Sequence, residues 1–200
     1  MTKTKILEMI KESIKNQSVF ILNDLVSALE SDIMDENNKA NGKSNVAKAI
    51  KAITGNKANF REDFQTAWIH KDRVTALDGY RLISTAEPVN VPIQDTPPIN
   101  ADKLINAFWE VNHEELSTPS IGDVKTKIAL DKANGEKVSH WIWDDGTFKI
   151  AVNAKYLLDM LLADPFSTIR ATQGNTTAPI YFNDPEALVF GILLPVRIAK

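Results

Sequence analysis

The sequence predicts an α+β fold, in which an antiparallel sheet carries helices on one face and a helical N-terminal extension precedes it. Three observations predict this fold. Apolar residues recur at helical spacing near the start, and short alternating segments end in Asn-Gly or Asp-Gly turns. The pattern of the last third predicts a strand, then a helix, then three strands. The 200 residues divide into an extension with a linker, at 1–43, and one domain at 44–200.

The extension is predicted to contain two helices. The first covers residues 5–14, and the second begins near Asn23, which can cap it. The polar run 35–43 has no apolar period, so it predicts a linker.

The first part of the domain is predicted to form a helix and a hairpin. Ser44 or Asn45 can cap a helix that Gly55 ends. Residues 64–69 and 73–77 are predicted strands, followed by an Asp78-Gly79 turn and a third strand at 81–85.

The middle of the chain, 88–146, is harder to place. Its prolines indicate an extended connection, and Asn100 can cap a helix that carries Leu104, Ile105 and Phe108. Alternation predicts strands at 124–130 and 138–143.

The last third gives the clearest pattern. Residues 148–152 alternate as a half-buried strand, and Asn153 is a good N-cap for the helix that follows. Strands are then predicted at 167–172, 178–182 and 188–198.

Composition limits the chemistry. The absence of cysteine removes disulfides, thiolate nucleophiles and zinc–cysteine sites. The start of the chain is charged throughout and no apolar run is long enough to cross a bilayer, so we expect a soluble, cytoplasmic protein. A net charge of −3 argues against a protein that grips DNA tightly, although not against one that surrounds it loosely.

Two segments resemble a known family. One is Val-Thr-Ala-Leu-Asp-Gly-Tyr-Arg-Leu at 74–82. The other is Phe-Lys-Ile-Ala-Val-Asn-Ala-Lys-Tyr-Leu-Leu-Asp-Met-Leu at 148–161, with Ile-Leu-Leu-Pro-Val-Arg-Ile at 192–198. Together they resemble the β subunit of bacterial DNA polymerase III, the sliding clamp, in motif order and in expected secondary structure. The resemblance covers about half of the chain, at 44–82 and 148–200.

The chain also departs from the family pattern. Family chains have three similar domains and close a ring of six, whereas 200 residues cannot hold three domains. Leu77 stands where the family motif has threonine, and 88–146 has no counterpart that can be placed. The chain is therefore either one clamp domain with 88–146 as an insertion or a fused remnant of the last two domains. We favour one elaborated domain of phage or mobile-element type.

The resemblance implies two kinds of site. In the family, the two motifs form an apolar cleft that binds extended hydrophobic peptides of polymerases and repair proteins, and helix lysines and arginines face DNA. Carried over by motif, the peptide-binding residues are Gly79, Tyr80, Arg81, Leu82, Ile192, Leu194, Pro195, Val196 and Arg197. The DNA-facing residues would be Lys48, Lys51, Lys57, Arg61, Lys103 and Lys155. The alternative interpretation is that Leu82, Ile192 and Leu194 are ordinary core residues of strands and that the lysines lie on a solvated helix face.

These expectations give a non-catalytic processivity factor with no cofactor and no metal. Its expected partners are DNA, bound weakly and without sequence preference, polymerase or repair-protein peptides, and further copies in a head-to-tail homo-oligomer. One alternative is a monomeric clamp-derived module that binds proteins and never encircles DNA. The other is a small hydrolase that uses His140, Asp144 and Asp145, although a polar hairpin tip explains these residues better.

Overall fold

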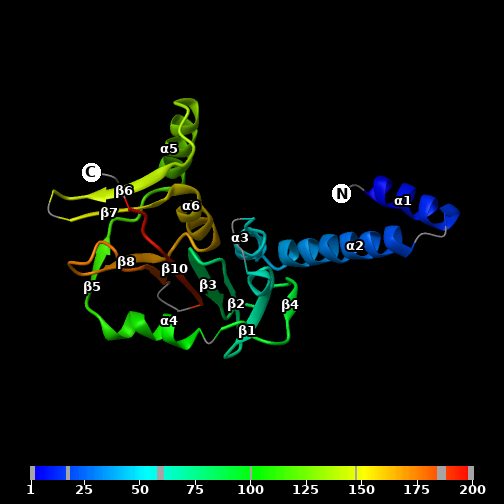
Figure 1. The fold of residues 1–200 in the computed structure, drawn as a ribbon, viewed down its shortest axis with the longest axis horizontal. Coiled ribbons are helices and arrows are strands. Elements are labelled where there is room, and N and C mark those ends of the chain that lie inside the picture. The colour runs from blue at the N-terminus through cyan, green and yellow to red at the C-terminus, as the bar shows by residue number, and fades with distance from the viewer. Residues whose placement is uncertain are drawn as a thin grey trace. The chain divides into compact units, whose positions relative to one another are not determined.

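The computed structural model describes residues 3–16, 19–57, 61–99, 101–146, 148–183 and 188–197. The chain divides into two compact units, Met1–Ser44 and Asn45–Lys200, next to the boundary expected from the sequence. Helices and a large mixed sheet give it the α+β class (Figure 1). None of the described helices is long and apolar enough to cross a membrane.

The first unit is a pair of helices that pack against each other, α1 (Lys3–Asn16) and α2 (Val19–Ala40). The prediction of two helices is confirmed, but α2 begins before Asn23. The linker predicted at 35–43 is wrong, because α2 continues through most of it. Polar residues do not end a helix by themselves; here Gly42 ends it, at φ 71°, with the Lys43 amide donating to the Asn38 carbonyl over 2.8 Å.

The second unit is built on an eight-stranded sheet with the order β4-β1-β2-β3-β10-β9-β8-β5. Its neighbouring strands run antiparallel except for β4, which pairs parallel to β1. The β1–β2 hairpin turns at Lys71 and Asp72, both with positive φ, as a two-residue hairpin requires. The strands are β1 (Ala67–His70), β2 (Arg73–Leu77), β3 (Arg81–Thr85), β4 (Ile93–Gln94), β5 (His113–Leu116), β8 (Thr168–Thr172), β9 (Ile180–Asn183) and β10 (Val189–Leu193).

The sheet contains the same arrangement twice. Helix α3 (Ser44–Thr54) precedes the antiparallel strands β1, β2 and β3, and helix α6 (Ala154–Ala163) precedes β8, β9 and β10. The last strand of each half pairs with the other antiparallel, with Ile83 opposite Gly191 at the middle of the pairing. A side chain at Gly191 would meet Met160 and Phe182, so this glycine lets α6 lie close to the sheet.

Helices cover both faces of the sheet, which corrects the expectation of a single covered face. One face packs under α3 and α6, and its core includes Ile50, Ile83 and Leu157. The opposite face carries α4 (Asp102–Asn106) and the 3₁₀ turn η2 (Ala107–Glu110), and its core includes Trp68 and Phe108. Figure 1 shows α4 on the side of the sheet away from α6. The expected cap Asn100 lies outside the described residues.

The middle segment, 88–146, forms part of the main sheet of this domain. It supplies β4 at one edge of the sheet and β5 at the other. The strand predicted at 124–130 is wrong: α5 (Ile121–Ala133) covers it, capped by Ser120, whose hydroxyl accepts from the Asp123 amide. Val124 and Ile128 lie four residues apart and pack into the core, which fits a helical as well as an alternating pattern.

A second, two-stranded sheet pairs β6 (His140–Asp144) with β7 (Lys149–Asn153). The predicted cap of α6 is confirmed, since the Asn153 side chain accepts from the Lys155 and Tyr156 amides. The last strand is shorter than predicted: β10 ends at Leu193, and Ile198 lies outside the described residues. The 3₁₀ turn η1 (Glu62–Phe64) takes the start of the predicted strand 64–69.

Candidate functional site

The structure brings the two motif segments together within one chain. Strands β3 and β10 pair so that Leu82 lies opposite Ile192 and Arg81 opposite Leu193. Beyond the strand ends, the Leu194 amide donates to the Tyr80 carbonyl over 2.8 Å. Residues about 110 positions apart in sequence therefore lie at the same end of the β3–β10 strand pair.

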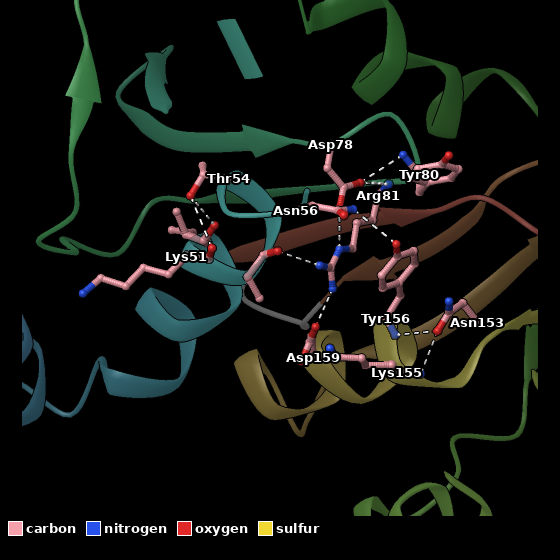
Figure 2. A network of polar contacts seen from close by, with 12 residues as sticks. Lys51, Thr54, Asn56, Asp78, Tyr80, Arg81, Asn153, Lys155, Tyr156 and Asp159 are labelled. Atoms are coloured by element: carbon pink, nitrogen blue, oxygen red, sulfur yellow. Dashed lines mark hydrogen bonds and ion pairs between the residues drawn. The ribbon is translucent and has the colours of Figure 1, made fainter. Parts of the chain in front are cut away.

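Arg81 is the centre of a buried polar network between β3, α3 and α6. Figure 2 shows its guanidinium among three oxygen acceptors. Nε donates to Asp78 Oδ2 over 3.0 Å, and the two terminal nitrogens donate to Asp159 Oδ2 over 2.5 Å and to the Ala52 carbonyl over 2.9 Å. The guanidinium carbon also lies 4.1 Å from the centre of the Tyr156 ring.

Asp78 organises the turn that precedes β3. Its Oδ1 accepts from the Tyr80 and Arg81 amides, both over 3.0 Å. Its Oδ2 accepts from Asn56 Nδ2 over 2.8 Å, which connects the turn to the end of α3. Gly79 adopts a φ of 82°, so the turn needs a residue without a Cβ there.

These contacts correct the role expected of Arg81. The side chain is 3% exposed and three acceptors hold it. A buried arginine with these partners orders the turn and connects the two helices to the sheet, so it is not open to a docking peptide.

The remaining motif residues differ in how exposed they are. Leu82 and Ile192 are buried in the core on the α4 side, so the ordinary-core reading fits them. Tyr80 is 43% exposed and Leu194 is 41% exposed. Gly79 and Arg197 are also exposed, and Pro195 and Val196 are half-buried. The surface open to a partner is thus formed by the turn at Gly79 and Tyr80 and by residues 194–197.

The 194–197 segment is held at both of its ends. Besides the Leu194 bond to Tyr80, the Val196 amide donates to the Ala151 carbonyl of β7 over 2.8 Å. The segment therefore passes from the end of β10 to the small sheet, as Figure 1 shows. Tyr156 of α6 borders the same region, with its ring centre 6.1 Å from that of Tyr80.

The six basic residues expected to face DNA do not share one surface. Lys48 on α3 and Lys155 on α6 are exposed, on helices that cover the same face of the sheet. Lys103 belongs to α4, on the opposite face, so its assignment to a common surface is corrected.

The other three expected residues follow or end α3. Lys51 is half-buried on α3, and Lys57 is exposed just after it. Arg61 forms an ion pair with Asp63 over 2.5 Å, and this hydrogen-bonded partner lowers the pKa of Asp63.

Sequence reasoning missed two sets of residues. Lys125 and Lys132 are exposed on α5, which packs against α6, and they were missed because this segment was predicted as a strand. Asn56, Tyr156 and Asp159 hold the Arg81 network. A weak signal existed for Tyr156 and Asp159, since a spacing of three residues places both on one side of α6.

The structure does not assemble the residues of the hydrolase alternative. His140 and Asp144 occupy opposite ends of β6, about 13 Å apart along an extended strand. Asp144 forms an ion pair with Lys149 over 3.0 Å, and this contact lowers its pKa. Within the described part of the chain, no cluster of three histidine or acidic residues is placed to bind a metal ion.

Comparison with known proteins adds no assignment. No protein-family model matches the sequence, and no curated protein is significantly similar to it.

Proposed function

We propose that this chain is a sliding-clamp-like protein without catalytic activity, which tethers a polymerase or repair protein to DNA by binding an extended apolar peptide. One observation carries the proposal. The Gly79–Tyr80 turn and the 194–197 segment, the two halves of the peptide site implied by the resemblance, lie side by side through the hydrogen bond between Leu194 and Tyr80.

The architecture supports the same proposal. The segment order helix, strand, strand, strand occurs twice, and the first of these helices with its two following strands resembles the clamp repeat in order and length. The two motifs lie at the same end of one strand pair, since one precedes β3 and the other follows β10, which runs antiparallel to β3.

The exposed residues suit a peptide that binds in extended form. Tyr80 and Leu194 offer apolar surface to the side chains of the peptide, and a tyrosine anchor loses little rotamer freedom on binding. Arg197, exposed at the edge, can pair with an acidic side chain or a carbonyl of the peptide. The buried Arg81 network keeps the turn in place before binding, which reduces the entropy lost on association.

A peptide titration tests the proposal. A short fluorescent peptide with leucine and phenylalanine side chains should bind the full chain with saturable anisotropy. Leu194→Asp should weaken binding about 30-fold or more, the loss expected for a hot-spot residue. Leu130→Asp is the matched control, because Leu130 is exposed on α5, which contributes no residue to the Gly79–Tyr80 turn or to the 194–197 segment, and its binding should match the wild type. Equal loss in both variants, or in neither, contradicts the proposal.

DNA contact is expected on the helical face that carries α3 and α6. Binding should be weak, independent of sequence and reduced by salt, because the net charge is −3 and few lysines neutralise phosphates. Lys48→Glu with Lys155→Glu should weaken duplex binding, whereas Lys103→Glu, on the opposite face, should not. Electrophoretic mobility or anisotropy at several salt concentrations measures this. An equal effect of Lys103→Glu would contradict the assignment of the face.

A second candidate is a clamp-derived module that binds proteins and does not encircle DNA. It is favoured by the fact that the motif segments meet inside one chain, so the docking surface does not need an assembled ring. This candidate keeps the peptide binding and predicts no DNA binding at any salt concentration.

A further inference from the structure

Helix α2 presents an apolar stripe to solvent. Leu22, Val26, Leu29 and Ile33 are 37–55% exposed, and they recur at intervals of four, three and four residues. This is the spacing of a helix–helix seam, and it places the four side chains within an arc of about 60° around the helix. An exposed apolar stripe of this length is uncommon on a surface that stays in water.

The stripe lies beside a face of α2 that is already covered. Leu25, which is 2% exposed, lies about 70° around the helix from the centre of the stripe. The apolar arc of α2 is thus wide enough for two neighbours, as for a helix in a four-helix bundle. Within the first unit, α1 supplies one neighbour.

The size of the unit indicates that the second neighbour is needed. Two helices of 14 and 22 residues bury little apolar surface on their own. The chain has no cysteine to cross-link them, and the described residues contain no metal cluster. Small helical units of this kind reach stability by association.

Charge identifies the partner as another copy of the same unit. Helix α1 contains four lysines and two glutamates, whereas α2 contains five acidic residues and one lysine. When two such hairpins form a bundle, each acidic α2 can lie between the basic α1 of its own copy and the basic α1 of the other copy. This arrangement offsets the repulsion between the two acidic helices.

We infer that the stripe Leu22, Val26, Leu29 and Ile33 is a dimerisation surface, on which the α1–α2 hairpin of a second copy of this chain completes a four-helix bundle. This surface belongs to the first unit, and the inference does not depend on peptide or DNA binding.

The test is the mass of the full chain in solution. Sedimentation equilibrium over a concentration series should give twice 22.2 kDa for the wild type at the upper concentrations. Val26→Glu should raise the dissociation constant about 10-fold or more, because it buries an unpaired charge in the seam. Ser27→Glu adds the same charge one residue further along, on an exposed position outside the stripe, and should leave the constant unchanged.

A milder variant separates loss of contact from loss of folding. Val26→Gln adds no charge at a position that is already 52% exposed, and it should weaken the dimer less than Val26→Glu while far-UV circular dichroism keeps its helical signal. A wild type that stays monomeric overturns the inference. So does a dimer that Val26→Glu leaves intact, because another surface would then hold it together.

Discussion

Two arginines in the motif segments have opposite surroundings. Arg81 is buried with three acceptors from the β2–β3 turn, α3 and α6, whereas Arg197 is exposed at the end of the described chain. The residues next to each arginine do not reveal this difference, because Arg81 begins β3, Arg197 follows β10, and both have apolar residues beside them. Two of the three partners of Arg81 come from positions 52 and 159, far from it in sequence.

The two arginines should therefore respond differently to the same substitution. Arg81→Ala leaves the Asp78 carboxylate buried without its cationic partner and should lower the free energy of unfolding by about 3–5 kcal/mol. Arg197→Ala should change it by about 0.5 kcal/mol or less, as at an ordinary surface position. Urea denaturation followed by circular dichroism measures both. If Arg81→Ala were as stable as the wild type, the network would not organise the turn.

At the scale of elements, α4 is attached to the β1–β2 turn through Asp102. Its Oδ1 lies 2.5 Å from Lys71 Nζ and 3.2 Å from His70 Nε2. The hydrogen bond from Lys71, followed by that from His70, lowers the pKa of Asp102 below its usual 3.8. These contacts hold the segment that covers the second face of the sheet, where Phe108 is buried.

The lowered pKa of Asp102 determines how the stability of the fold depends on pH. The folded chain holds the Asp102 carboxylate more strongly than the unfolded chain does, so its contribution to stability is complete above pH 3.8 and is lost as pH falls through the lowered pKa. Asp102→Asn should lower the urea midpoint near neutral pH, and the difference from the wild type should shrink below pH 3.8. A difference that is independent of pH would show that Asp102 acts through packing alone.

Local signals account for the elements that were predicted correctly. The Asp78-Gly79 turn, the Asn153 cap and the position of β7 each depend on residues close in sequence, although the alternation predicted for β7 is wrong because Ile150, Ala151 and Val152 are all buried. α5 was predicted wrongly because Val124, Thr126, Ile128 and Leu130 alternate as in a strand, although only Val124 and Ile128 pack into the core. The 35–43 run was predicted wrongly because exposed helix turns need no apolar period.

At the scale of the whole molecule, the sequence predicted which segments form the candidate site but not how their side chains are used. The proximity of Tyr80 and Leu194 follows from the pairing of β3 with β10, which only a long-range contact decides. Leu82 and Phe108 belong to one buried cluster, so the burial of Leu82 depends on the segment of α4 and η2 that covers the second face. Neither the second covered face nor the mixed sheet has a local signature.

The proposed docking site for a partner peptide lies where the Gly79–Tyr80 turn meets residues 194–197. Hydrogen–deuterium exchange of the full chain, with and without the leucine- and phenylalanine-containing peptide, tests it directly. If the peptide binds there, exchange should slow in fragments that cover residues 79–82 and 192–197 and stay unchanged in α1, α2 and α4. Slower exchange confined to 102–111, or no slowing at saturating peptide, would contradict it.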